Sequence, residues 1–103
     1  GGFGMNAGLQ DAANLVEKLG KVWRGAAGED LLDRYVRQRR TVNIEYVQEA
    51  SVRNKRTLEE RDPAVRSQRL EDYRRAAETP ARAKEILMKS SMIASMRRAN
   101  AIQ

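Results

Sequence analysis

The chain has 103 residues, of which 41% are hydrophobic and 33% are charged, and its formal net charge is +6 at pH 7. It contains no cysteine and no histidine, which excludes disulfide bonds, thiolate nucleophiles, most zinc sites and the usual general base. With only two prolines and few aromatic residues, this composition favours an all-α fold over a β-rich one. We therefore expect a small helical domain with no catalytic residue and no metal ligand of its own.

The first eight residues are rich in glycine and predict a loop, residues 1–8, that leads into a helix. Such a junction points unpaired backbone N–H groups and the positive end of a helix dipole at one place, which suits an anionic or electron-rich ligand. The glycine spacing resembles a dinucleotide phosphate loop, but that fingerprint needs a βαβ unit, and only helices are predicted to follow. By pattern alone, an ordinary helix entrance capped by Asn6 explains the stretch equally well.

The first predicted helix runs from about residue 7 to residue 24 and ends at Gly25. Its apolar side chains recur at helical spacing and form one stripe, which we expect to face the core: Ala12, Leu15, Val16, Leu19, Val22 and Trp23. The second helix begins near Glu29 and is expected to continue to about Leu58. Because the connection between them is short, these two helices should pack as an antiparallel pair, the unit spanning residues 9–60.

The second predicted helix has two irregular features. The β-branched stretch at residues 41–44 predicts a kink or a short break. Arg39 stands where the apolar stripe requires an apolar side chain, which is explained if its aliphatic stem packs and its guanidinium reaches a partner.

The last part of the chain, residues 61–103, is predicted to be a helical tail. Asp62 and Thr79 each precede a proline, and each is expected to cap a helix that begins at that proline. These helices should run to about residue 77 and about residue 99. Together with the antiparallel pair, they make about four helices in all. The last of them should lie back across the antiparallel pair. It carries methionines four residues apart, a spacing that favours packing against a neighbour: Met88, Met92 and Met96.

Basic residues cluster at residues 37–40, 53–56 and 97–98, a pattern that can bind phosphates. Fourteen acidic residues are interspersed with them and no base-reading motif is present, so we do not expect nucleic acid as a partner. No apolar run approaches the roughly 18–20 residues that a membrane span needs. With no signal peptide visible either, we expect a cytoplasmic protein.

The opening stretch resembles a known family over about residues 1–40. Its residues 2–19 read GFGMNAGLQDAANLVEKL, and Gly25, a Leu-Leu-x-x-Tyr at 31–35 and an Arg-Arg pair at 39–40 follow. This succession is similar to the C-terminal part of the FAD-dependent aromatic hydroxylases, the class A flavoprotein monooxygenases of the p-hydroxybenzoate hydroxylase type. The resemblance, together with the abrupt start of the chain, leads us to expect a fragment of a larger α/β FAD-binding protein.

The resemblance implies a flavin-facing role for Gly2, Gly4, Met5 and Asn6, whose backbone would lie beside the N1–C2=O edge of the flavin ring. It also implies FAD as cofactor, NAD(P)H as reductant, O₂-dependent hydroxylation and an aromatic substrate. The partners would be N-terminal FAD-binding and substrate domains, without which we expect the 103 residues neither to hold FAD tightly nor to be active. Two other readings stay open: a stand-alone helical module that self-associates through the methionine face, and a basic nucleic-acid-binding domain.

Overall fold

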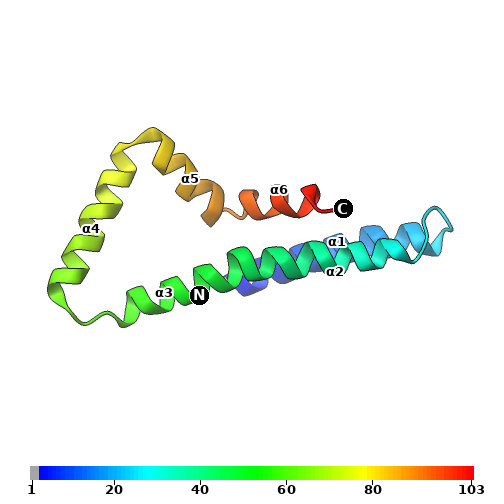
Figure 1. Cartoon of the computed structure of the whole chain (residues 1–103), viewed down its shortest axis with the longest axis horizontal. Coiled ribbons are helices and arrows are strands. Elements are labelled where there is room, and N and C mark those ends of the chain that lie inside the picture. Colours follow the sequence, from blue (N-terminus) through cyan, green and yellow to red (C-terminus); the bar gives the residue numbers. More distant parts are fainter. Residues whose placement is uncertain (1–2) are drawn as a thin grey trace.

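The computed structural model of the chain describes residues 3–103 and confirms the all-α prediction (Figure 1). This described part contains no strand. Its elements are α1 (Phe3–Trp23), α2 (Asp30–Val42), the π-helix η1 (Asn43–Gln48), α3 (Glu49–Glu59), α4 (Pro63–Glu78), α5 (Pro80–Ser90) and α6 (Ile93–Ala101).

The predicted loop at residues 1–8 is wrong over the residues that the structure describes, because α1 already begins at Phe3. Asn6 therefore lies inside the helix and is not its N-cap. Two glycines of this stretch each weaken a helix by about 1 kcal/mol relative to alanine. Residues 3–9 include no proline and no β-branched residue, however, and they include good helix formers such as Met5, Ala7 and Leu9.

The end of α1 at Gly25 is confirmed, and its hydrogen bonds explain it. The Gly25 N–H donates to the Val22 carbonyl O at 3.0 Å, and the Ala26 N–H donates to the Lys21 carbonyl O at 2.9 Å. These two bonds form a Schellman motif, in which the residue after the helix takes a left-handed conformation. Gly25 has φ of 70°, a conformation that glycine adopts without a steric cost.

A single rod made of α2, η1 and α3 runs antiparallel to α1, as expected (Figure 1). The predicted second helix is therefore confirmed in extent, and its expected irregularity is the π-helical segment that begins at Asn43. Thr41, Val42 and Ile44 are β-branched and crowd the preceding turn of an α-helix. A wider π turn in this place changes the direction in which the following side chains point.

The two proline-marked helix starts are confirmed in position, but only one has the expected cap. The Ala64 N–H donates to Asp62 Oδ1 at 2.9 Å, which makes Asp62 the side-chain cap of α4. Thr79 precedes α5 without capping it, because its Oγ1 donates instead to the Arg75 carbonyl O at 3.1 Å. This hydroxyl serves the end of α4 and not the start of α5.

The predicted single helix after Pro80 is wrong, since it is divided into α5 and α6. Met92 sits at the break with φ of 63°, and among the described residues it is the one non-glycine residue with positive φ. Just before it, Ser90 and Ser91 donate from Oγ to the carbonyl oxygens of Leu87 and Met88. Such side-chain bonds compete with the regular helical pattern and help to end α5.

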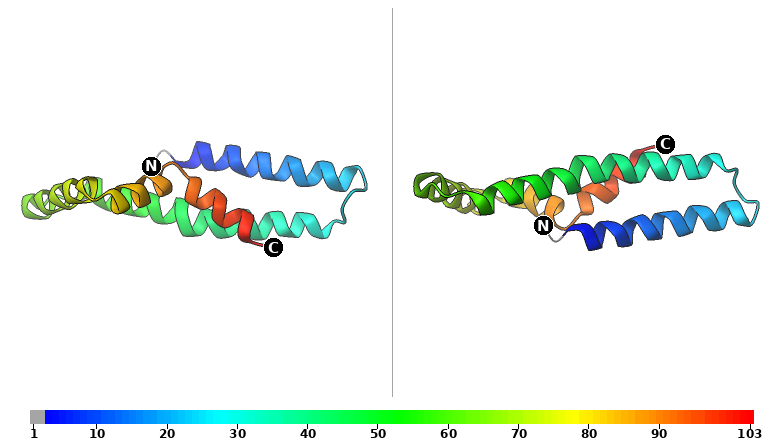
Figure 2. Two further views of the ribbon diagram at one scale, coloured as in Figure 1. Left: turned by 90° about the horizontal axis from the view of Figure 1, so that it is seen from above. Right: turned by 90° about the horizontal axis from the view of Figure 1, so that it is seen from below.

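The chain end returns over the α1–α2 pair, as expected, but only α6 does so (Figure 2). Gln38 Nε2 and Arg34 Nε both donate to the Ile102 carbonyl O, at 2.9 and 3.1 Å. Arg98 forms an ion pair with Glu45 at 3.1 Å, which joins α6 to η1. These polar contacts, with buried Ala99, hold the tail against the pair.

The molecule is extended, with principal extents of 59 × 28 × 17 Å. Its radius of gyration is 17.6 Å, whereas a compact domain of this length has about 13 Å. The buried hydrophobic residues are mostly small: Ala7, Val42, Ala50, Ala76, Met92 and Ala99. No helix within residues 3–103 is long and apolar enough to cross a membrane.

Candidate functional site

The candidate site is the N-terminal end of α1. Of the four predicted flavin-facing residues, Gly2 lies outside the described residues. Gly4, Met5 and Asn6 are all exposed on the first turns of the helix. The N–H groups of Phe3, Gly4 and Met5 belong to the first turn, where a helix offers its amides no partner of its own. The structure thus places the described candidates together at one accessible helix end.

The charge at this end favours an electron-rich ligand. The first turn of α1 holds no acidic residue, so no carboxylate of the helix itself neutralises the positive end of the dipole. Space is available as well, because a Cβ built on Gly4 meets no atom within 4 Å. Backbone amides, positive potential and open space are what a planar ligand needs in order to approach the main chain.

A cavity of about 660 Å³ opens beside the start of α1. It lies between Phe3, the π-helix η1 and helices α3, α4 and α5, with Tyr46, Tyr73 and Met92 in its wall. Glu45 and Glu49 also line it, and Glu45 is paired with Arg98. The surface that borders the helix end is therefore mixed, with aromatic and apolar side chains next to charged ones.

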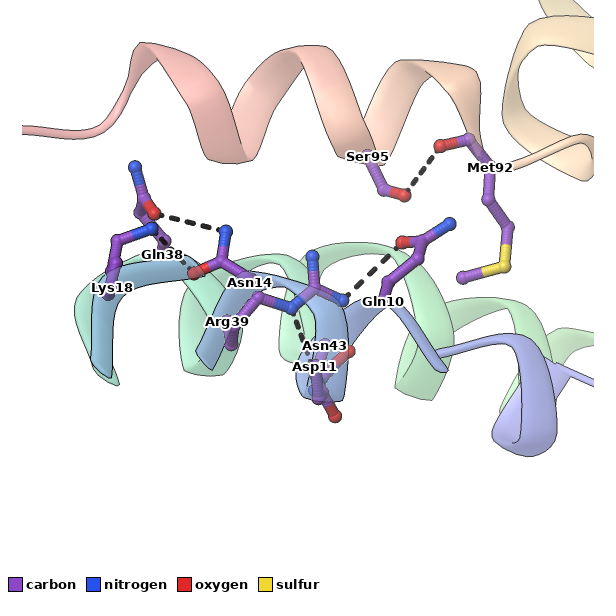
Figure 3. A network of polar contacts seen from close by, with 9 residues as sticks. All are labelled: Gln10, Asp11, Asn14, Lys18, Gln38, Arg39, Asn43, Met92 and Ser95. Atoms are coloured by element: carbon purple, nitrogen blue, oxygen red, sulfur yellow. Dashed lines mark hydrogen bonds and ion pairs between the residues drawn. The ribbon is translucent and has the colours of Figure 1, made fainter. Parts of the chain in front are cut away.

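A polar network holds α1 against α2, and on α1 it begins at Gln10 and Asp11, further along the helix than the candidate site (Figure 3). Arg39 Nε donates to Asp11 Oδ1 at 2.6 Å, and Arg39 itself is buried. Asn43 Nδ2 donates to both carboxylate oxygens of Asp11 at 3.2 Å, and Arg39 also reaches Gln10 Oε1 at 3.4 Å. The expectation that the guanidinium of Arg39 finds a partner is confirmed, and the partner is Asp11.

A second set of contacts lies further along the same helix pair. Lys18 Nζ donates to Asn14 Oδ1 at 2.7 Å, and Asn14 Nδ2 donates to Gln38 Oε1 at 3.3 Å. Lys18 is buried, and the loss of hydration lowers its pKa below the usual 10.5. The face of α1 that meets α2 is thus polar, and the signal was available in the sequence as Asp11, Asn14 and Lys18 at helical spacing.

The expected apolar stripe of α1 does not face α2. Leu15 and Val22 are half-buried, whereas the other members of the stripe are exposed. An exposed row with spacings of four and three residues runs along the helix, and we term it the apolar seam of α1: Met5, Leu9, Ala12, Val16, Leu19 and Trp23. Trp23 is 88% exposed, which is far from the usual burial of a tryptophan. The periodicity of the sequence predicted the position of this row on the helix, but it did not predict that the row is exposed.

No group of three or more acidic side chains that could hold a metal ion occurs within residues 3–103. Several residues of the basic clusters form ion pairs. Arg39 is paired with Asp11, Arg53 with Glu49 and Arg98 with Glu45. These pairs lower the number of cations that are free to meet a phosphate chain.

Comparison with known proteins gives a consistent picture. Residues 1–50 match the family described as FAD binding domain. The chain is 52% identical over 58 residues to the 4-methyl-5-nitrocatechol 5-monooxygenase of a Burkholderia species, covering 56% of this chain and 11% of that enzyme. It is 43% identical over 54 residues to the tetracenomycin A2 monooxygenase-dioxygenase of Streptomyces glaucescens, covering 52% of this chain and 10% of that enzyme.

A third relative is the pentachlorophenol 4-monooxygenase of Sphingobium chlorophenolicum, 55% identical over 42 residues, or 41% of this chain and 8% of that enzyme. The chain spans about a tenth of the length of the curated relatives that it matches. No solved structure matches it significantly.

Proposed function

Residues 1–50 belong to the FAD-binding domain family and are related to FAD-dependent aromatic hydroxylases, and from this premise we propose that the chain acts as the flavin-facing helical segment of such a monooxygenase. The observation that carries the proposal is the exposed first turn of α1, which combines unpaired amides, no acidic residue and open space at Gly4. Gly4, Met5 and Asn6 are the described residues that would lie beside the flavin ring. Bound FAD would supply the redox chemistry, with NAD(P)H as reductant and O₂ as oxidant.

The role of these residues is to bind and orient the ring. The amides of the first turn can donate hydrogen bonds to the oxygen and nitrogen atoms at the N1–C2=O edge, where reduced flavin carries negative charge. The positive end of α1 stabilises that charge. Gly4 allows the main chain to approach closely, since any side chain there would project into the open space.

The apolar seam of α1 supports a further part of the proposal, that α1 packs on the remainder of an FAD-binding domain. Its exposed members include Leu9, Val16 and Trp23, and no charged residue belongs to the row. An exposed apolar row of this length is unusual in a chain that works alone. The relatives carry about nine tenths of their length outside the matched segment, which provides the partner that would cover it.

By analogy with the relatives, the substrate of the complete enzyme would be aromatic, as nitrocatechol and pentachlorophenol are. The described residues offer neither a base nor a nucleophile with an unusual environment at the helix end. We therefore expect the 103 residues to be inactive alone and to bind FAD weakly. A purified chain that is yellow, with a flavin absorption spectrum, contradicts this part of the proposal.

The proposal is tested by a graft. The 58 residues that match the Burkholderia 4-methyl-5-nitrocatechol 5-monooxygenase replace their counterparts in that enzyme, and bound FAD and its reduction by NAD(P)H are measured. We expect the graft to retain FAD. A graft that folds but purifies without FAD contradicts the proposal.

A matched pair of variants then locates the contact. Gly4→Ala and Gly8→Ala both add one methyl group at an exposed helical glycine with open space around its Cβ. Because Gly4 is proposed to lie against the ring and Gly8 is not, we expect only Gly4→Ala to weaken FAD binding. Equal effects of the two changes would argue against a flavin contact at Gly4.

Self-association is the second candidate, and one observation favours it. The four-three spacing of the apolar seam is the spacing of a coiled-coil interface. The methionine face expected for this role is not available as a whole, since Met92 is buried. Sedimentation velocity of the 103-residue chain tests this candidate, with the double variant Leu9→Glu and Val16→Glu as comparison. A parent chain that sediments as a dimer and a double variant that sediments as a monomer support self-association.

A further inference from the structure

One partly buried ion pair joins the N-terminal half of α1 to the rest of the molecule. The side chain of Arg39 is 6% exposed and that of Asp11 is 28% exposed, and their closest atoms are 2.6 Å apart. Asn43, the first residue of η1, donates to both oxygens of the same carboxylate. Asp11 therefore meets α2 and the start of the π-helix at a single point (Figure 3).

Little else anchors this half of the helix. Ala7 is buried, but Met5 and Leu9 on either side of it are 76% and 64% exposed. The C-terminal half of α1 has a separate attachment through Lys18, Asn14 and Gln38. The two contacts with α2 are three residues apart on α1, at Asp11 and Asn14, and they use different side chains of α2, so a substitution can remove one without the other.

We propose that Asp11 and Arg39 are positioning residues that hold the first turns of α1 in register on α2. This inference rests on the proposed function for its consequence, since the first turn is the part that would face the flavin. Asp11 lies five to seven residues after Gly4, Met5 and Asn6. At about 1.5 Å per residue, the pair acts on the flavin-facing turn from a distance of roughly 10 Å.

The geometry explains why these residue types are needed. The guanidinium of Arg39 donates from Nε to Asp11 and from a terminal nitrogen to Gln10 Oε1, so it grips two consecutive residues of α1. A lysine has its three donors on one nitrogen, so it lacks the fixed fork by which the guanidinium reaches both acceptors from separate nitrogens. Asn43 then fixes the orientation of the carboxylate through both of its oxygens. A shift of α1 by one residue along α2 breaks all of these bonds at once.

The test is made on the full 103-residue chain by amide hydrogen exchange, with Asp11→Asn and Arg39→Lys. Asp11→Asn keeps the shape and one acceptor but removes the charge. We expect exchange of the amides at residues 7–11 to rise at least about tenfold, because hydrogen bonds to charged groups contribute more than neutral ones. Amides at residues 16–23 should be unchanged, since the hydrogen bond from Asn14 to Gln38 still joins that half to α2.

Glu17→Gln is the matched control, because Glu17 forms an exposed ion pair with Lys21 on the same helix. It should leave both sets of amides unchanged. Arg39→Lys keeps the charge and should give a smaller rise than Asp11→Asn at the same amides. Unchanged exchange at residues 7–11 in both variants overturns the inference, and so does an equal rise along the whole of α1, which indicates general destabilisation.

The consequence for flavin is measured in the graft described above. We expect Asp11→Asn to weaken FAD binding about tenfold or more in the graft while the Glu17→Gln graft binds as the parent does. A local rise in exchange together with unchanged FAD binding overturns the link between the pair and the flavin. If the parent graft holds no FAD, the proposed function fails, and the exchange result still decides whether Asp11 and Arg39 position the helix.

Discussion

Ser95 donates a hydrogen bond from its Oγ to the carbonyl O of Met92 at 2.8 Å. Met92 is the residue with the left-handed backbone conformation. Both side chains are buried where α6 returns over the α1–α2 pair. The bond closes the turn that allows α6 to leave the direction of α5. The return of the tail therefore depends on a short-range contact within it.

Ser95→Ala is expected to lower the free energy of unfolding by about 1 kcal/mol, because a buried hydrogen bond is lost, although the Met92 carbonyl keeps its bond from the Met96 N–H. Ser91→Ala is the control, since its hydroxyl bond to Met88 is exposed and 3.5 Å long. Urea unfolding followed by circular dichroism measures both. Equal losses in the two variants speak against a special role for Ser95.

Gly25→Ala should lower the free energy of unfolding by about 1–2 kcal/mol, because an alanine at φ of 70° has a steric cost that glycine avoids. Gly8→Ala should instead raise it by roughly 0.5–1 kcal/mol, since this glycine is helical and its Cβ would meet no atom within 4 Å. Thermal unfolding of the two variants separates these opposite signs. Stabilisation by Gly25→Ala contradicts the assigned turn.

Asp62→Ala removes the side-chain cap of α4 and is expected to lower stability by about 1 kcal/mol. Thr79→Ala should destabilise the start of α5 less than Asp62→Ala destabilises the start of α4, because the Thr79 hydroxyl does not cap α5. Helix content after each change can be measured by circular dichroism, and chemical shifts of residues 64–66 and 81–83 report the two helix starts separately. Loss of order at residues 81–83 in Thr79→Ala argues that its side chain does cap α5.

Lys18 predicts a particular dependence of stability on pH. Burial lowers its pKa in the folded chain below 10.5, so between the folded pKa and 10.5 the unfolded chain binds more protons at this position. The contribution of Lys18 to the free energy of unfolding therefore increases as pH rises through that window. The difference between the parent and Lys18→Met, measured by urea unfolding over alkaline pH, should show this rise.

Taking the difference between parent and variant removes the effect of other groups. Lys89, for example, has a raised pKa because it is hydrogen-bonded to Glu85, and its contribution to stability is lost as pH rises through the folded pKa. Lys21→Met, at an exposed lysine of the same helix, is the control. A difference curve for Lys18→Met that is flat or falls with pH contradicts the buried environment of Lys18.

Several features were determined by the sequence alone, because they depend on neighbouring residues. Gly25 ends α1, Asp62 with Pro63 begins α4, and the short connection after Gly25 makes α1 and α2 an antiparallel pair. The kinship of residues 1–50 with FAD-binding domains also follows from consecutive residues, whose identities are sufficient to recognise it. Each of these signals acts over a few positions in the chain.

Tertiary structure decided what each helix faces. Periodicity identified the apolar row of α1, but Asp11, Asn14 and Lys18 on the other side meet α2 instead. The partner of Arg39 lies 28 residues away. Local propensities differ by less than a kcal/mol per residue, so contacts between distant residues override them. A buried charge requires a partner, and only the folded chain brings Asp11 to Arg39.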